Sequence, residues 1–129
     1  MPRSASCMYT CGIIVESLQD RDILRSLAPH LVRERVAEMP GEPEGVWHIR
    51  EYGIPEDALE QVLAALEGAV KHEWYSHLFN LELGILYVVF AGKHFRLPAV
   101  RDDSWEAMIS YGLTVGVDRK WTGSIPLRV

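Results

Sequence analysis

The segment from Pro55 to Val70 constrains the fold more than any other part of this sequence. Its apolar residues recur at the three- and four-residue spacing of one helix face. Pro55 suits the first helical position, and the acidic Glu56 and Asp57 favour the positive end of the helix dipole. We therefore predict an amphipathic helix, whose core-facing residues are Ala58, Leu59, Val62, Leu63, Leu66, Ala69 and Val70.

The chain before this helix begins with a predicted strand and a short helix. Tyr9 to Glu16 is rich in Ile and Val, and Gly12 within it allows a neighbouring element to approach closely. The segment Ser17–Asp20 has the character of a capping box with Asp in place of Glu, and it predicts that a helix opens there. The apolar face of that helix consists of Ile23, Leu24 and Leu27.

Two interpretations of His30–Met39 stay open. Pro29 disfavours helix at the residue before it, which favours a strand, but the segment could also continue the helix with a kink. A turn rich in Pro and Gly then leads to a predicted strand over Val46–Tyr52. Because two extended segments around such a turn indicate a β-hairpin, we prefer the strand interpretation.

The C-terminal half predicts a second hairpin, one more helix and an extended tail. The hairpin strands are Trp74–Asn80 and Ile85–Leu97, and Pro98 ends the second strand. The D-x-x-E pattern at Asp103–Glu106 is typical of a helix start, and Gly112 or Gly116 closes this helix. We expect Trp121–Val129 to be extended.

In chain order these elements predict an α+β fold with a ferredoxin-like βαββαβ core, followed by an extra strand and a helix. The sheet is expected to be antiparallel, with two helices on one face and the other face in need of cover. The last helix or a second subunit could supply that cover, and we expect a homodimer. No internal linker or repeat interrupts residues 1–129, which predicts a single domain.

Composition and charge argue against several function classes. The net charge of -5 argues against a nucleic-acid-binding module, which needs Lys and Arg against phosphates. No apolar run reaches the roughly 20 residues of a membrane helix, and the N-terminus lacks the apolar core of a signal peptide. We therefore expect a cytoplasmic protein with no nucleic-acid or membrane partner. Cys7 and Cys11 are predicted to be reduced and structural, since strand positions four apart lie too far from each other for a disulfide.

Several segments, in order over most of the chain, carry a shared pattern. They are Tyr9–Leu18, Trp47–His48, Ile54–Glu56, Trp74–Tyr75 with Asn80, Val89–Phe90 through Lys93–Phe95, and Tyr111–Gly112 with Gly116. The pattern resembles a family of small uncharacterised bacterial and archaeal proteins. That family typically has an acidic residue where this chain has His77, and a Gln-x-Asp-Phe-like ending where this chain has Trp121–Ser124. The resemblance implies one stable fold and brings no chemistry with it, because no activity is established for the family.

The candidate site residues gather in the second predicted hairpin. Trp74, Tyr75 and His77 place aromatic and imidazole groups on one rigid element, and His48 lies in another predicted strand. Large aromatic side chains anchor ligands and interfaces at low entropic cost. We therefore predict that these four residues bind a partner protein or a small molecule, and Trp121 is favoured for an interface. No catalytic residue or cofactor is assigned, because the sequence has no nucleophile elbow and no phosphate-binding glycine loop.

Two other functions stay open. On a strand, Glu73, Tyr75 and His77 share one face, so a carboxylate, a phenol and an imidazole could serve as acid and base groups of a small enzyme. Alternatively, His48, His77 and His94 could meet across adjacent strands and bind a metal ion. Their spacing matches no metal-binding motif, so no metal ligand is assigned. The absence of a catalytic signature favours the binding domain over the enzyme.

Overall fold

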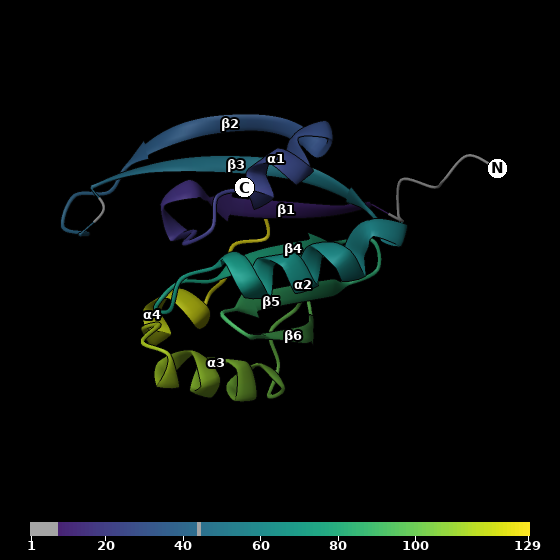
Figure 1. Cartoon of the computed structure of the whole chain (residues 1–129). Coiled ribbons are helices and arrows are strands. Elements are labelled where there is room, and N and C mark those ends of the chain that lie inside the picture. The colour runs from purple at the N-terminus through teal and green to yellow at the C-terminus, as the bar shows by residue number, and fades with distance from the viewer. Residues whose placement is uncertain (1–7, 44) are drawn as a thin grey trace.

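A computed structural model describes residues 8–43 and 45–129 of the chain. Its centre is one antiparallel sheet with the strand order β2-β3-β1-β4-β5-β6 (Figure 1). The strands are β1 (Met8–Ile14), β2 (Leu31–Glu38), β3 (Val46–Pro55), β4 (Ser76–Asn80), β5 (Ile85–Phe90) and β6 (Lys93–Pro98). Cys7, predicted to be reduced, lies outside the described residues.

One face of the sheet is covered by α1 (Ile23–Leu27) and α2 (Leu59–Ala69), and α2 crosses in front of the sheet in Figure 1. Three short 3-10 turns, η2 (Val15–Ser17), η3 (Ala28–His30) and η4 (Glu56–Ala58), join these helices to the strands. The predicted apolar stripe of α2 packs against inward-facing strand residues. These include Cys11, Ile13, Tyr52, Ile54 and Leu78.

The other face is covered only in part. The helices α3 (Trp105–Thr114) and α4 (Arg119–Thr122), with the C-terminal tail, pack on β4, β5 and β6 (Figure 1). Phe79, Leu86, Val88 and Phe90 supply the strand side of this second core, and Met108 and Ile109 supply the helix side. The same face of β2, β3 and β1 carries the exposed Met8 and Val32, whose side chains lie 3.5 and 3.6 Å from the position that a Cβ atom of residue 53 would take.

The structure confirms the α+β class, the antiparallel sheet and the strand interpretation of His30–Met39, within which Leu31–Glu38 forms β2. The strongest helix prediction is also confirmed, with one adjustment at its start. Pro55 ends β3, the acidic residues after it form η4, and regular α-helix begins at Leu59.

The predicted strand Ile85–Leu97 is wrong in one respect, because the chain reverses direction within it. Gly92 adopts a φ of 81°, in the left-handed region that glycine tolerates best, and the chain turns there from β5 into β6. The order of elements is therefore not a simple βαββαβ with one added strand and helix. The tail is also not extended throughout, because Trp121 belongs to α4, whose start is capped by the Asp118 side chain.

The capping box predicted at Ser17–Asp20 is wrong, whereas the predicted last helix is confirmed as α3 with its N-cap one residue later than expected. The Ser17 hydroxyl donates to the carbonyl of Ile14 at 2.6 Å instead of capping a helix, and α1 begins only at Ile23. At α3 the N-cap is Ser104, whose backbone N–H donates to the Asp102 carboxylate at 2.8 Å. Short polar side chains bond to nearby backbone in several turn geometries, so their spacing alone does not fix a helix start.

Within residues 8–43 and 45–129, no helix is both long and apolar enough to cross a membrane.

Candidate ligand-binding cleft

The half-covered face of the sheet forms the floor of a cleft of about 590 Å³. In the strand ladders Arg35 lies opposite Ile49, and Ile49 lies opposite Ile14. In the neighbouring row, Gly12 lies opposite His77. Residues directly opposite in an antiparallel ladder project to the same face, so these side chains share one surface. The volume falls within the range of about 300–1,000 Å³ that is typical of small-molecule sites.

Three tryptophans from separate parts of the chain form an aromatic wall of the cleft. The ring of Trp47, on β3, lies 5.4 Å from that of Trp74, which precedes β4. It lies 5.8 Å from the ring of Trp121, on α4. Both distances are in the range of attractive aromatic contacts. The wall therefore ties β3, the start of β4 and the C-terminal segment together.

His77 lies at the covered end of the cleft, on β4. Its ring stacks on Phe79 at a centroid distance of 5.6 Å, and the tail residue Val129 lies over the same position. Burial lowers the pKa of His77 to about 4, although the backbone of Arg128 and Pro126 partly opposes this shift. The imidazole is therefore neutral at pH 7. Its buried Nε2 makes no hydrogen bond within the described part of the chain.

Gly12 makes room for this imidazole. A Cβ atom at residue 12 would lie 2.8 Å from Cε1 of His77 and 3.0 Å from Cγ2 of Val129. The prediction that Gly12 allows a close approach is thus confirmed, and the approaching group is the His77 side chain.

Tyr75 and Glu73 also line the cleft. The Tyr75 hydroxyl donates to the carbonyl of Trp121 at 3.5 Å, and burial raises its pKa to about 12. Glu73 has a φ of 75° and lies on the exposed rim against Gly116. The cleft therefore brings together the predicted acid–base candidates Glu73, Tyr75 and His77. The predicted binding residue Trp74 lines the same cleft, because β4 itself begins only at Ser76.

The remaining predicted binding residue, His48, lies away from the cleft. Its Nδ1 lies 2.6 Å from one carboxylate oxygen of Glu16, and its backbone N–H donates to the other at 2.7 Å. Burial raises the pKa of Glu16, but these hydrogen bonds from His48 outweigh burial and leave the pKa below its usual value. His48 and Glu16 thus form a local pair on the rim of β3.

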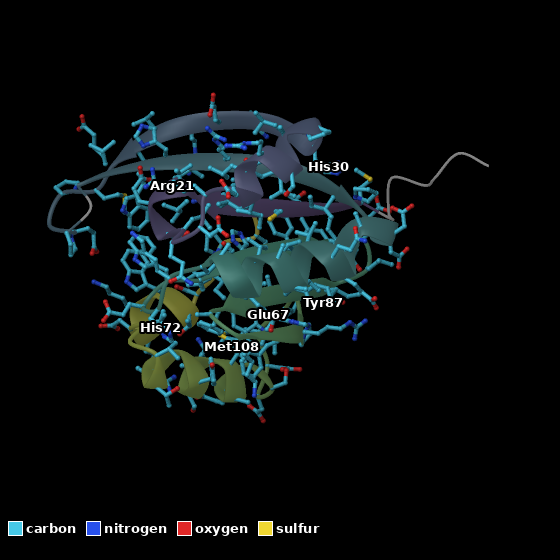
Figure 2. The ribbon with its side chains drawn as sticks, viewed as in Figure 1. Arg21, His30, Glu67, His72, Tyr87 and Met108 are labelled. Carbon is cyan, nitrogen blue, oxygen red and sulfur yellow. The ribbon has the colours of Figure 1, made fainter. Side chains whose placement is uncertain are left out.

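The strand histidines do not converge on a common site. His94 pairs with Glu67 of α2 at 3.6 Å and contacts the ring of Tyr87, and Figure 2 shows Glu67 and Tyr87 beside each other at α2 and β5. His48 pairs with Glu16, and His77 lies under the C-terminal tail. Among the residues that the structure describes, no three His, Cys, Asp or Glu side chains form a metal-binding group.

The sequence interpretation missed Arg35 and the tail residues Pro126, Arg128 and Val129 as parts of this site. Arg35 was one of several charged residues in an ambiguous segment. The tail carries no motif and reaches the cleft only because the chain after α4 returns toward β1, as Figure 1 shows in yellow. No local pattern identifies either contribution.

No family model, no curated protein and no solved structure matches this chain. The resemblance of its segments to the family of small bacterial and archaeal proteins therefore stays a prediction.

Proposed function

We propose that this protein is a small binding domain that holds a small-molecule ligand in the cleft between the sheet and the C-terminal segment. The observation that carries the proposal is the aromatic wall of Trp47, Trp74 and Trp121 around a cleft of about 590 Å³. Ligand sites combine mainly apolar and aromatic linings with a few polar groups that orient the ligand. Here the polar groups include Arg35 and His77.

A small enzyme is the second candidate, because Glu73, Tyr75 and His77 line the same cleft. The pKa shifts of Tyr75 and His77 favour binding over catalysis. An acid or base works best with a pKa near the operating pH. The pKa of about 4 makes His77 a weak base, and the pKa of about 12 keeps Tyr75 a neutral phenol. Both groups are thus suited to accept or donate hydrogen bonds without changing charge.

We also propose that β1 to β4 with α1 and α2 form a ferredoxin-like unit, to which β5, β6, α3 and α4 are added. The proposal is supported by the antiparallel order β2-β3-β1-β4 and by the two helices that connect β1 to β2 and β3 to β4. A homodimer through the uncovered half of the sheet, around Met8 and Val32, stays a prediction, and sedimentation velocity measures it directly.

The proposed ligand site is tested by filling the cleft without disturbing the core. Ser124 is exposed and lines the cleft, so Ser124→Trp places a large ring inside it. Gln61→Trp is the matched control, because Gln61 is exposed on α2 and lines neither this cleft nor the cavity beside α2. Circular dichroism and thermal unfolding establish that both variants fold.

The readout is a screen of soluble aromatic fragments by ¹H–¹⁵N NMR, with the indole N–H signals of Trp47 and Trp121 as reporters. We expect some fragments to shift these indole signals in the wild type and in Gln61→Trp. The same fragments should cause no such shifts in Ser124→Trp. Fragments that bind Ser124→Trp equally well, or a screen in which no fragment shifts either indole signal, would contradict the proposed function.

A further inference from the structure

We infer that the ligand of this cleft is a planar aromatic anion, with its ring against the tryptophan wall and its negative group at the β2 end on Arg35. The inference rests on the proposed function and adds the chemical class of the ligand and its orientation. It is carried by the arrangement of charges and hydrogen-bond donors around an apolar floor.

The floor and wall fit a flat ring. Ile49 and Ile14 are neighbours in one row of the sheet, so the centre of the floor is aliphatic. Trp47 and Trp121 are inclined to each other by 49° with centroids 5.8 Å apart, and they border this floor. A planar ring in this position makes both aliphatic and aromatic contacts.

A positive group and an unpaired donor belong to neighbouring positions on one sheet face at the β2 end. Arg35 lies opposite Ile49, and Trp47 lies opposite Ala37, so Arg35 and Trp47 are diagonal neighbours on the same face. Diagonal neighbours in a sheet lie about 7–8 Å apart between Cα atoms, within reach of long side chains. The indole N–H of Trp47 is buried and has no acceptor among the described residues. An anionic oxygen at this end would receive the indole hydrogen bond and face the guanidinium group.

The two arginines that line the cleft have no ion-pair partner among the described residues. In the part of the chain that the structure describes, neither Arg35 nor Arg128 has a carboxylate within ion-pair distance, whereas the nearby Arg33 pairs with Glu51 at 2.9 Å. The third cation, Lys120, is already engaged, because its ammonium lies 3.8 Å from Glu42 and 5.1 Å from the ring centre of Trp121. A cationic ligand would therefore be repelled by the ammonium group that already lies on the tryptophan face and by the two unpaired arginines.

The acidic residues of the cleft do not offset this charge at the β2 end. Glu42 faces Lys120, and the Asp118 carboxylate accepts the backbone N–H of Lys120 at 2.9 Å as the cap of α4. Glu73 precedes β4, three strands from β2, and strands lie about 4.8 Å apart, so about 14 Å separates it from the β2 end. The cleft is thus positive at β2 and negative near the start of β4, which orients an anion toward Arg35.

The test compares three ligands with the same ring and different charge: 2-naphthoate, neutral 2-naphthamide and 2-naphthylmethylammonium. Binding to the full chain is measured by isothermal titration calorimetry at low salt, and NMR shifts of the Trp47 indole N–H place the ligand. The variants are Arg35→Gln and Arg33→Gln. They remove the same charge from the same strand face, but only Arg35 lines the cleft.

We expect 2-naphthoate to bind the wild type about tenfold or more tightly than 2-naphthamide, because hydrogen bonds to charged groups are stronger than neutral ones. Arg35→Gln should abolish this preference while leaving the affinity for 2-naphthamide within about twofold, and Arg33→Gln should keep the preference. Arg128→Gln should reduce the preference in part.

Two kinds of result would overturn the inference, one against the charge assignment and one against the ligand class. Equal binding of all three ligands, tightest binding of the ammonium, or an anion preference that survives Arg35→Gln would refute the charge assignment and leave the cleft as a binding site. Absence of binding by any of the three at millimolar concentration would refute the ligand class. The comparison of Ser124→Trp with Gln61→Trp then decides the proposed function separately.

Discussion

Replacement of Gly12 by alanine should destabilise the fold. This is the opposite of the usual effect, because glycine in a strand interior weakens the strand and its replacement normally stabilises it. The new methyl group would lie 2.8 Å from Cε1 of His77, where carbon atoms normally approach to about 3.5–4.0 Å. The imidazole cannot simply move aside, because it stacks on Phe79 and the Val129 side chain lies 3.0 Å from the same methyl position. One of these groups must therefore shift by several tenths of an ångström.

The size of the effect follows from two opposing contributions. Overpacking of a filled site costs about 1–3 kcal/mol, and the loss of backbone freedom of glycine in the unfolded chain returns about 0.5–1 kcal/mol. We expect Gly12→Ala to lower the free energy of unfolding by about 1 kcal/mol, which corresponds to about 4 °C in Tm for a chain of this size. The measurement is urea unfolding followed by tryptophan fluorescence.

Two control proteins separate this contact from a general effect of alanine. Gly68 is exposed on α2 with no heavy atom within 4 Å of its Cβ position, so Gly68→Ala should stabilise the protein by about 0.5–1 kcal/mol. In a His77→Ala background the obstructing ring is gone, and Gly12→Ala should become neutral or stabilising. A loss of the same size in both backgrounds, or no loss in the wild type, would refute the packing of His77 on Gly12.

Three further predictions concern titratable groups. Burial lowers the pKa of His77 to about 4 from the usual 6.5, so the folded state resists a proton that the unfolded chain accepts. Stability should therefore fall between pH 6.5 and 4, by up to about 3 kcal/mol, and urea unfolding of His77→Gln over this range should show a smaller fall. Because the pKa of Glu16 is lowered in the folded state, its ionised carboxylate stabilises the fold at pH 7, and this contribution is lost as the pH falls below about 4.5. Glu16→Gln should therefore be less stable than wild type at pH 7 and should lose less stability in acid. A pH dependence equal to that of the wild type would contradict the pairing with His48. Burial raises the pKa of Cys11 to about 12, so in a Cys7→Ser variant the thiol should react with Ellman's reagent only after denaturant is added, and rapid labelling of the native protein would contradict its burial.

Elements with a regular local pattern were predictable from the sequence. The stripe of α2, the Ile- and Val-rich composition of β1 and the alternation in β3 and β4 are properties of neighbouring residues, so the local sequence identifies them. The division of Ile85–Leu97 into β5 and β6 was not predicted, because Gly92 is the only glycine in this segment and no proline or second turn residue accompanies it. A two-residue reversal at one glycine leaves little trace in such a pattern, and only the pairing of β6 back onto β5 shows it.

The candidate site was predictable only on the β4 side. Trp74, Tyr75 and His77 are adjacent in sequence, so an aromatic and imidazole cluster was visible there. Arg35 and Trp121 reach the same cleft through strand pairing and the return of the chain after α4, which depend on contacts between distant segments. His48 lies outside the cleft for the same reason, because the ladder places it opposite Val36, on the other face of the sheet from Arg35 and Ile49.

The cleft follows from a sheet that is wider than its cover. Six strands at about 4.8 Å spacing extend across about 24 Å, whereas α3, α4 and the tail pack mainly on β4, β5 and β6. The cover ends over β1, where Val129 meets Gly12, and the sheet surface beyond that line forms the floor. Residues at this boundary contact core on one side and cleft on the other. That position explains how one short strand supplies both a buried, neutral imidazole at His77 and the lining of a ligand site.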